Sequence, residues 1–323
     1  MKSLRIATLA GLVCVVSATA ALAQGYPNKP VRVLVPFAAG GAVDILGRTM
    51  AQALSESLGQ SFVVENRPGV GGLITLEAVA AAAPDGYTIA VASAGPMSVS
   101  PSLFAARAFD PIRQLESVIL FANTPGVIVG RPDLPAVNVS ELVALSKTRA
   151  GGLTMGSAGS GSVLHLMGEY FQNRQGIKWT HVPYKGSNPA LLDLAASRVD
   201  VMVDVVPTAA PYVKTGKLKG YATTTQKRAS QLPDLATLEE QGFRGYDMGS
   251  WMGIVVPKGT SAEIVGKLNS VLNAALRTPE MQSRLVTMGA EPEGGAPSHF
   301  AQRLATDLPR WAEVIRSSGT KVE

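Results

Sequence analysis

Val31-Arg-Val-Leu-Val35 is followed at once by Pro36-Phe-Ala-Ala-Gly-Gly41, and a helical pattern begins at Asp44. A second stretch repeats this order, with Leu153-Thr-Met-Gly-Ser-Ala-Gly-Ser-Gly161 before a helical pattern that contains His165. A Gly-rich turn between a strand and a helix leaves backbone N–H groups free at the positive end of the helix, which suits an anion. Two such turns, far apart in the chain, indicate two lobes that grip one anionic ligand.

The rest of the chain alternates between strand-like and helix-like segments. Short apolar runs predict strands, and apolar residues three or four positions apart predict helices. We expect strands over residues 31–35, 62–65, 87–92, 153–155, 180–183, 199–203 and 218–223, and helices over 44–58, 73–83, 139–147, 162–173, 188–196, 263–277, 280–285 and 299–316. This alternation predicts an α/β fold in which helices cover mostly parallel sheets.

Two longer extended segments stand outside this rhythm. Val118–Val129 is largely apolar but contains Asn123-Thr-Pro-Gly126, where we expect an interruption, and Ser250–Val256 is the second segment. We interpret them as the two crossings between lobes. The predicted division is then residues 24–123 for the first part of lobe 1, 124–246 for lobe 2, and 247–323 for the return to lobe 1.

The first 23 residues have the composition of an export signal. Lys2 and Arg5 precede an uncharged apolar run, and Ala21-Leu-Ala23 matches a small-x-small cleavage site. We expect cleavage after Ala23 and export to the periplasm. Because Cys14 is the only cysteine, the mature chain would contain no thiol, which excludes disulfides, a cysteine nucleophile and thiolate metal sites.

Charge and motifs argue against an enzyme or a nucleic-acid-binding protein. The net charge is +5, of which the export signal contributes two, and no basic stripe with interleaved aromatic residues is present. The sequence contains no nucleophile-elbow, Walker or dinucleotide-binding motif. The three histidines, His165, His181 and His299, show no metal-ligand spacing. We therefore expect a binding protein without a cofactor or a metal.

Several polar side chains lie where a ligand would bind. The second turn adds hydroxyl groups beside its N–H groups, from Ser157, Ser160 and Ser162. His165, near the start of the following helix, either donates to the ligand or is packed inside. Asp204 directly follows the strand over 199–203, at the carboxyl edge of the sheet. It either accepts from a ligand amine or a bridging water, or caps a helix that starts near Pro207.

A set of motifs, in a fixed order, resembles the Bug-type solute-binding proteins of tripartite tricarboxylate transporters. These motifs extend over essentially the whole mature chain and include Tyr26-Pro-Asn-Lys-Pro30, Pro36-Phe-x-x-Gly-Gly41 with Asp44, Val64-Glu-Asn-Arg-Pro-Gly69, Ala83-Pro-Asp-Gly-Tyr87, Ser157-Ala-Gly-x-Gly161, His181-Val-Pro-Tyr-Lys-Gly186 and Trp251-x-Gly253. The resemblance implies a two-lobed periplasmic-binding-protein fold, a Venus flytrap with a mostly parallel sheet in each lobe. It also implies a monomer that holds a small carboxylate between its lobes and delivers it to membrane permease subunits.

The resemblance further implies which positions bind the ligand. The loop after the first strand and the Gly/Ser loop of the second lobe embrace one carboxylate, and the turn at Ser93-Ala94 and an aspartate lie beside them. The matching positions are Phe37, Ala38, Ala39, Gly40, Gly41, Asp44, Ser93, Ala94, Ser157, Ser160, Gly161, Ser162, His165 and Asp204.

Three side chains of this sequence depart from the family pattern toward lower polarity. Val163, Leu164 and Val205 stand where relatives commonly offer polar groups. If these side chains face the cleft, the far end of the pocket is more apolar than usual, which disfavours citrate because buried polar groups without partners cost about 1–3 kcal/mol each. We expect an aromatic or aliphatic mono- or dicarboxylate instead. A periplasmic receptor that docks on a signalling protein is the alternative function.

Overall fold

Strands and helices alternate through the described part of the chain. The computed structural model describes residues 25–320, so the predicted export signal and the cleavage after Ala23 lie outside it. The strands are β1 (Val31–Val35), β2 (Phe62–Asn66), β3 (Thr88–Ser93), β4 (Leu115–Gly130), β5 (Leu153–Ser157), β6 (Trp179–Pro183), β7 (Val201–Val205), β8 (Lys219–Thr223), β9 (Gly249–Pro257) and β10 (Glu291–Pro292). The longer helices are α2 (Ala42–Leu58), α3 (Leu73–Ala80), α6 (Val139–Thr148), α7 (Val163–Gln175), α8 (Ser187–Ala195), α9 (Val206–Lys214), α10 (Ala262–Leu276), α11 (Pro279–Thr287) and α12 (Pro297–Ser318). The predicted helices and strands are confirmed to within a few residues at each end.

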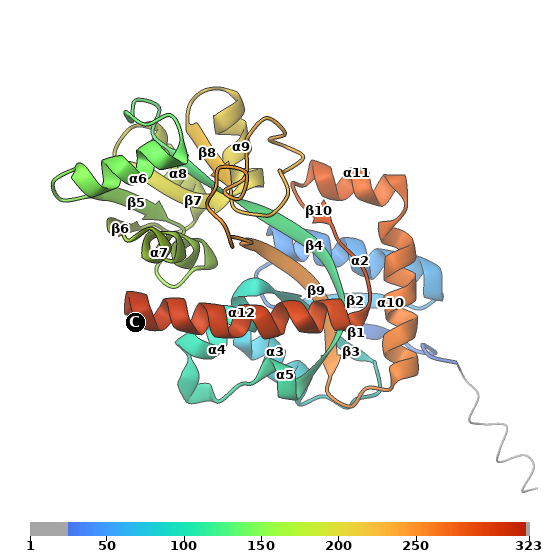
Figure 1. Cartoon of the computed structure of the whole chain (residues 1–323). Helices are drawn as coiled ribbons and strands as arrows, with labels where there is room; N and C mark the ends of the chain where they lie inside the picture. Colours follow the sequence, from blue (N-terminus) through green and yellow to red (C-terminus); the bar gives the residue numbers. More distant parts are fainter. Residues whose placement is uncertain (1–24, 321–323) are drawn as a thin grey trace, which may run out of the picture.

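The strands lie in the order β2-β1-β3-β9-β4-β7-β5-β6, with β8 and β10 also paired to β4 (Figure 1). In the first lobe β1 is parallel to β2 and β3, and in the second lobe β5 is parallel to β6 and β7. The loops after β1, β3, β5 and β7 therefore leave the carboxyl ends of parallel strands, which is the edge where ligands bind in α/β folds.

Two long antiparallel strands connect the lobes. β4 pairs with β9 from Leu115 opposite Pro257 to Pro125 opposite Gly249, and β4 then continues into the second lobe beside β7 and β8. The interruption that we expected at Asn123–Gly126 is wrong, because the strand runs through it. Packing, and not a turn, favours glycine at position 126, since a Cβ atom there would lie 2.4 Å from the Thr224 Oγ1 atom, which is itself bound to the Met248 carbonyl.

Helices cover both faces of each sheet. In the first lobe α2 and α10 pack on one face, and α3 with the first half of α12 covers the other. In the second lobe α6 and α7 cover one face, while α8 and α9 cover the other. On α2 the side chains of Leu46, Met50 and Leu54 are almost wholly buried, and their helical spacing is what made this helix predictable. Burial of each such side chain stabilises the fold by about 1.5–3 kcal/mol.

Four helical segments have a proline in their first two positions, and only the one near Pro207 was considered from the sequence. They are η3, a π-helical turn (Gly95–Val99), α4 (Ser100–Leu103), α5 (Pro111–Gln114) and α9, all with proline at their first or second position. Proline has no N–H group, but the first N–H groups of a helix have no partner within the helix, so proline is tolerated there.

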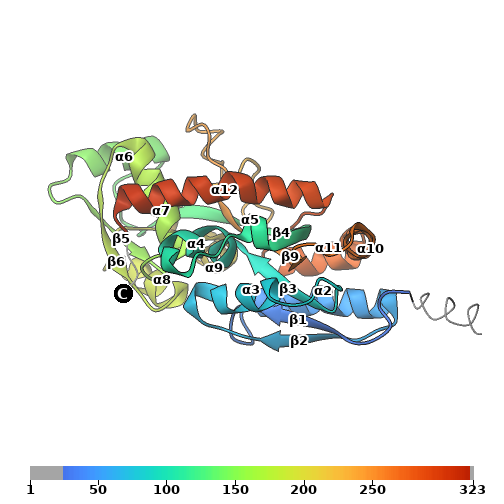
Figure 2. The ribbon, with the colours of Figure 1, turned by 90° about the horizontal axis from the view of Figure 1, so that it is seen from below.

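The C-terminal helix reaches from the first lobe to the second (Figures 1 and 2). Its start packs on the first lobe through Phe300 and Leu304. Near its end, Trp311 and Val314 join the apolar cluster of the second lobe. The Asn173 side chain of α7 also donates to the Ser317 hydroxyl over 2.8 Å. α12 therefore braces the two lobes against each other.

Candidate functional site

The loop after β1 is held in shape by two side chains. Asp44 accepts from the Gly40 N–H group over 2.9 Å and from the Asn66 amide over 2.8 Å. The same Asn66 amide donates to the Phe37 carbonyl over 2.9 Å. Burial raises the pKa of Asp44, but hydrogen bonds from Arg48, Gly40 and Asn66 outweigh it and bring the pKa to about 2. The ionised Asp44 carboxylate therefore holds the loop in place through its hydrogen bonds with Gly40 and Asn66.

The backbone of this loop is accessible to solvent. Residues 37–41 are all exposed, and Gly40 has a φ of 85°. Gly41 is the residue before the first turn of α2, and no side chain caps that end of the helix. Because the first N–H groups of a helix lack partners within it and lie at its positive end, this end of α2 is suited to bind an anion.

The loop after β5 has most of its polar groups turned inward. The Ser157 hydroxyl is fully buried, lies 2.7 Å from the His181 Nε2 atom, and accepts from the Gly159 N–H group over 3.1 Å. The Ser162 hydroxyl caps α7 by accepting from the His165 N–H group over 3.2 Å. Of the three predicted serines, Ser160 alone is exposed. Ser157 and Ser162 therefore shape the loop from within.

His165 and His181 form a stacked pair beneath this loop. Their ring centroids are 3.8 Å apart and the ring planes differ by 16°. His165 accepts from the Gly161 N–H group at Nδ1 over 3.2 Å, and its Nε2 atom lies 3.5 Å from a Glu169 carboxylate oxygen. Burial, followed by the neighbouring His165, lowers the pKa of His181 to about 4. His181 was not predicted as a site residue, because it lies on a different strand from its partner Ser157, 24 residues further along the chain.

The third predicted turn brings the lobes into contact. Ser93 and Ala94, at the end of β3, are buried and lead into η3. A Cβ atom on Gly95 would lie 3.7 Å from a methyl group of Val163. Val163 packs against the apolar clusters of both lobes. The start of α7 therefore lies at the interface between the lobes.

Asp204, at the end of β7, is fully buried. Its Oδ1 atom accepts from the Ser187 hydroxyl over 2.9 Å and from the Val205 N–H group over 2.8 Å. Its Oδ2 atom has no hydrogen-bond partner among the described residues. Burial raises the pKa of Asp204 to about 6, against the effect of these hydrogen bonds. Among the described residues, Oδ2 is therefore the buried oxygen of this carboxylate without a hydrogen-bond partner.

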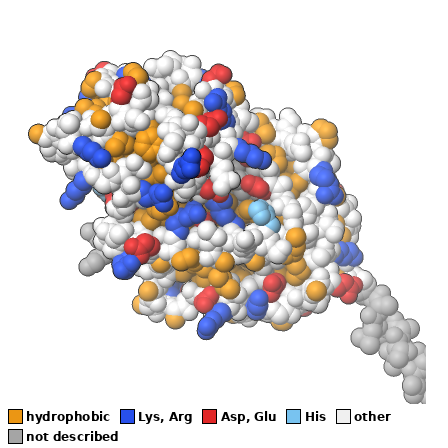
Figure 3. All heavy atoms as spheres, in the orientation of Figure 1, with side chains coloured by type: hydrophobic (Ala, Val, Ile, Leu, Met, Phe, Trp, Pro, Cys, Tyr) orange, Lys and Arg blue, Asp and Glu red, His pale blue; other side chains and the backbone are white. Residues whose placement is uncertain are grey.

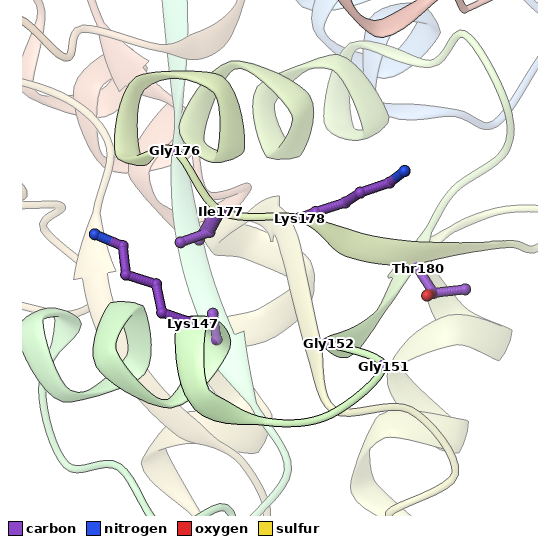
Figure 4. A pocket seen from close by; sticks show the side chains of 8 residues that line it. Lys147, Gly151, Gly152, Gly176, Ile177, Lys178 and Thr180 are labelled. Carbon is purple, nitrogen blue, oxygen red and sulfur yellow. The ribbon is translucent and has the colours of Figure 1, made fainter.

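Two other hollows do not converge on a ligand. A pocket of about 550 Å³ lies where β5 and β6 begin, at the opposite edge of the second lobe, and its side chains Lys147 and Lys178 extend away from each other (Figure 4). On the face shown in Figure 3, Lys, Arg and His side chains gather above α12. In the hollow between β10 and α12, Arg303 is paired with Asp247 and Asp307, and the His299 Nε2 atom lies 3.8 Å from a Glu293 oxygen.

Residues 25–320 contain neither a metal-binding cluster nor a helix that could span a membrane. No three His, Cys, Asp or Glu side chains in this range come together as a metal site. None of the helices in the same range is both long enough and apolar enough to cross a membrane.

Comparison with known proteins decides the family. The sequence profile of the family described as "Tripartite tricarboxylate transporter family receptor" matches residues 46–320. The chain belongs to this family. It is 33% identical to the protein BugT of Bordetella pertussis over 302 residues, which is 93% of each chain. It is 36% identical over 299 residues to an Agrobacterium vitis protein from the TAR-I ttuE-ttuC' intergenic region, covering 92% of this chain and 86% of the relative.

Solved structures of this receptor family share the fold. A Rhodopseudomonas palustris protein solved with adipate has a TM-score of 0.77 at 35% identity, over 92% of this chain and 99% of that chain. MatC from the same organism, solved with bound malate, has a TM-score of 0.73 at 33% identity, over 90% of this chain and 100% of that chain. The predicted two-lobed periplasmic-binding-protein fold is confirmed. The receptor is a solute-binding protein and not an enzyme, and the full burial of Ser157 agrees with this, since a nucleophile must be reached by its substrate.

Proposed function

We propose that this receptor captures a small organic carboxylate between its two lobes and delivers it to the permease subunits of a tripartite transporter. The observation that carries the proposal is the loop after β1. Its backbone is exposed at the uncapped start of α2, while Asp44 and Asn66 hold its shape from behind. Relatives that share the fold were solved with adipate and with malate, which are both dicarboxylates.

The proposal divides the predicted site residues into two groups. Residues that contact the ligand are the exposed or unpartnered ones, Phe37, Ala38, Ala39, Gly40, Gly41, Ser160 and Asp204, with Ser93 and Ala94 beside them. Residues that position the loops are Asp44, Ser157, Gly161, Ser162 and His165, whose polar groups already bind protein atoms; Gly40 is exposed, but its N–H group is likewise bound to Asp44. Backbone N–H groups would then supply most of the anion binding, because no Lys or Arg belongs to either group.

The ligand that this proposal favours is an aliphatic or aromatic mono- or dicarboxylate. Val163 lies between the lobes, and Leu164 and Val205 are only partly buried near the start of α7 and the end of β7. Apolar side chains in these places leave a third carboxylate of citrate without partners, at a cost of about 1–3 kcal/mol for each unpaired group. Calorimetry with adipate, malate, benzoate and citrate tests this. Tight binding of citrate with no response to the other acids would exclude the proposed ligand class.

Export and the lobe boundaries belong to the same proposal. The chain would be exported by residues 1–23 and act in the periplasm as a monomer. The chain would pass from the first lobe to the second within β4, near residue 123, and return just before β9, near residue 247. N-terminal sequencing of the periplasmic protein should begin at Gln24.

A pair of matched glycine variants tests the loop. Gly40 and Gly59 flank α2, have φ values of 85° and 67°, and both have open space where a Cβ atom would lie. Alanine at either position should therefore lower stability by a similar amount, about 1–2 kcal/mol, because left-handed backbone disfavours a Cβ atom. Gly40→Ala should weaken adipate binding at least tenfold, whereas Gly59→Ala should leave it unchanged. Equal affinities for adipate in the two variants would show that the loop does not bind the carboxylate.

A further inference from the structure

We propose that His181 is a positioning residue for ligand binding, because it and His165 form one stacked unit that fixes both ends of the second ligand loop. The inference rests on the proposed function, since it assigns the support of a loop that the proposal places at the carboxylate. His181 itself would not contact the ligand.

The two rings hold the loop at opposite ends. At its start, the His181 Nε2 atom lies 2.7 Å from the Ser157 hydroxyl. At its end, the His165 Nδ1 atom accepts from the Gly161 N–H group over 3.2 Å. The rings come from different elements, β6 and α7, and they stack at 3.8 Å with nearly parallel planes. A change in one ring is therefore transmitted to the other end of the loop.

The loop needs such a support because its own backbone does not fix it. Gly159 and Gly161 have φ values of 125° and 74°, a region that glycine enters at little cost, so these residues keep many alternative conformations. The Gly159 N–H group is bound to the same Ser157 hydroxyl that His181 holds, over 3.1 Å. Fixing the Ser157 hydroxyl therefore also fixes the direction of a backbone N–H group in the middle of the loop.

Other roles for the pair fit the geometry less well. Ser157 is fully buried, so the Ser157–His181 contact does not present a nucleophile. His165 has its Nδ1 atom on Gly161 and its Nε2 atom toward Glu169, so neither nitrogen is free to bind a ligand or a metal. A role in loop position accounts for both contacts and for the stacking.

In this proposal the Ser157 hydroxyl, which already accepts from Gly159, donates to the His181 Nε2 atom, so the His181 ring must be neutral. Since His165 accepts at Nδ1, its proton lies on Nε2, and a second proton would replace the acceptor of Gly161 by a donor. The titratable neighbours of His181 are His165 and Glu169, both on α7, and its hydrogen-bond partner on β5 is Ser157. Burial and the stacked His165 keep the pKa of His181 at about 4, although Glu169 opposes them. Protonation of His181 would therefore disturb the loop only as the pH falls below about 5.

Three histidine variants separate positioning from general stability. His181→Phe keeps a ring for stacking but loses the bond to Ser157, whereas His181→Gln can place an amide oxygen near the position of Nε2 and accept from the same hydroxyl. Isothermal calorimetry with adipate at pH 7.5 should show at least tenfold weaker binding for His181→Phe and less than a threefold change for His181→Gln. His299→Phe, an exposed residue paired with Glu293, is the matched control and should bind as the wild type does. Unchanged adipate affinity in His181→Phe would overturn the proposal.

A pH series gives a readout that a structural role alone would not change. The ratio of wild-type to His181→Gln affinity cancels the titration of adipate itself. This ratio should be constant from pH 7.5 to pH 5 and should then fall toward pH 4. A ratio that stays constant throughout would contradict the requirement for a neutral ring at position 181.

Failure of the proposed function would be recognised separately. In that case the wild type would bind none of the tested carboxylates, and hydrogen exchange of the amides at residues 158–161 replaces calorimetry as the readout. His181→Phe should raise exchange there at least tenfold relative to wild type and to His299→Phe. Equal exchange in the three proteins would overturn the positioning role whatever the ligand is.

Discussion

Asp204 combines a charge with complete burial. Its Oδ1 atom has two hydrogen-bond donors and its Oδ2 atom has none among the described residues. Loss of hydration raises the pKa of Asp204 more than its hydrogen bonds lower it, so the pKa is about 6 in the folded protein, against 3.8 for the free side chain. The folded protein therefore binds the proton more tightly than the unfolded chain does. It follows that Asp204 lowers the free energy of unfolding as the pH rises from about 4 to about 6.

The first prediction concerns this pH dependence. Asp204→Asn removes the titration, so the stability of the wild type relative to the variant should be greater at pH 4 than at pH 7. A shift of about two pKa units corresponds to at most about 3 kcal/mol between these pH values. Chemical denaturation at pH 4, 5, 6 and 7 measures the difference, with the exposed Asp234→Asn as a control. A difference that does not vary with pH would show that burial does not raise the pKa of Asp204.

For single residues, the sequence predicted where in the fold each residue lies better than it predicted where its side chain points. It placed Gly40, Gly161 and Asp204 at the carboxyl ends of strands, where the structure has them. It could not predict that Ser157 turns inward, because its partner His181 lies on a neighbouring strand. In the same way, the orientation of Asp44 depends on Asn66, 22 residues further along the chain. Contacts between residues far apart in the chain fix the orientation of these side chains, and such contacts produce no pattern in the neighbouring sequence.

Among the elements, α12 is attached to the crossing strand β9 by a buried carboxylate. Asp307 accepts from the Trp251 indole over 2.7 Å and from Arg303 over 3.0 Å, and Arg310 lies 3.4 Å from its other oxygen. Asp307 and Trp251 are both almost fully buried. The helix was predictable from its apolar spacing, but this attachment was not, because it joins residues 56 positions apart.

The second prediction tests the attachment. Asp307→Ala leaves the Trp251 N–H group and Arg303 without their partner, and we expect a loss of about 3–5 kcal/mol in the free energy of unfolding. Glu313→Ala breaks the exposed Glu313–Arg316 pair on the same helix and should cost less than about 1 kcal/mol. Urea denaturation of both variants measures these values. Comparable losses would mean that α12 is not fixed through Asp307.

For the whole molecule, the relation between the lobes depends on a few contacts. Val163 of α7 lies against η3 of the first lobe, and a Cβ atom on Gly289 would meet Pro207 of α9 at 2.3 Å. The end of α12 packs beside α7. Contacts of this kind favour the closed arrangement, and a ligand between the lobes would add to them.

The third prediction tests closure. Val163→Lys should place a charged group in this interface, oppose closure and weaken adipate binding about tenfold or more. Val137→Lys adds the same charge at an exposed position of the second lobe and should have no effect. In small-angle scattering, adipate should reduce the radius of gyration of wild type and Val137→Lys but not of Val163→Lys. Compaction of all three proteins to the same size would exclude Val163 as a closure contact.

The pairing of β4 with β9 also sets the order in which the protein can be completed during synthesis. Ser93 lies beside Met252, and Leu115 lies beside Pro257, so the sheet of the first lobe lacks a central strand until the chain has been made to residue 257. A nascent chain that ends near residue 246 would contain β1 to β8 with β3 exposed along one edge, and exposed edges promote aggregation. Long-range pairing of this kind also slows folding. The first lobe, although its chain is made first, is therefore completed last, after all the strands of the second lobe have been synthesised.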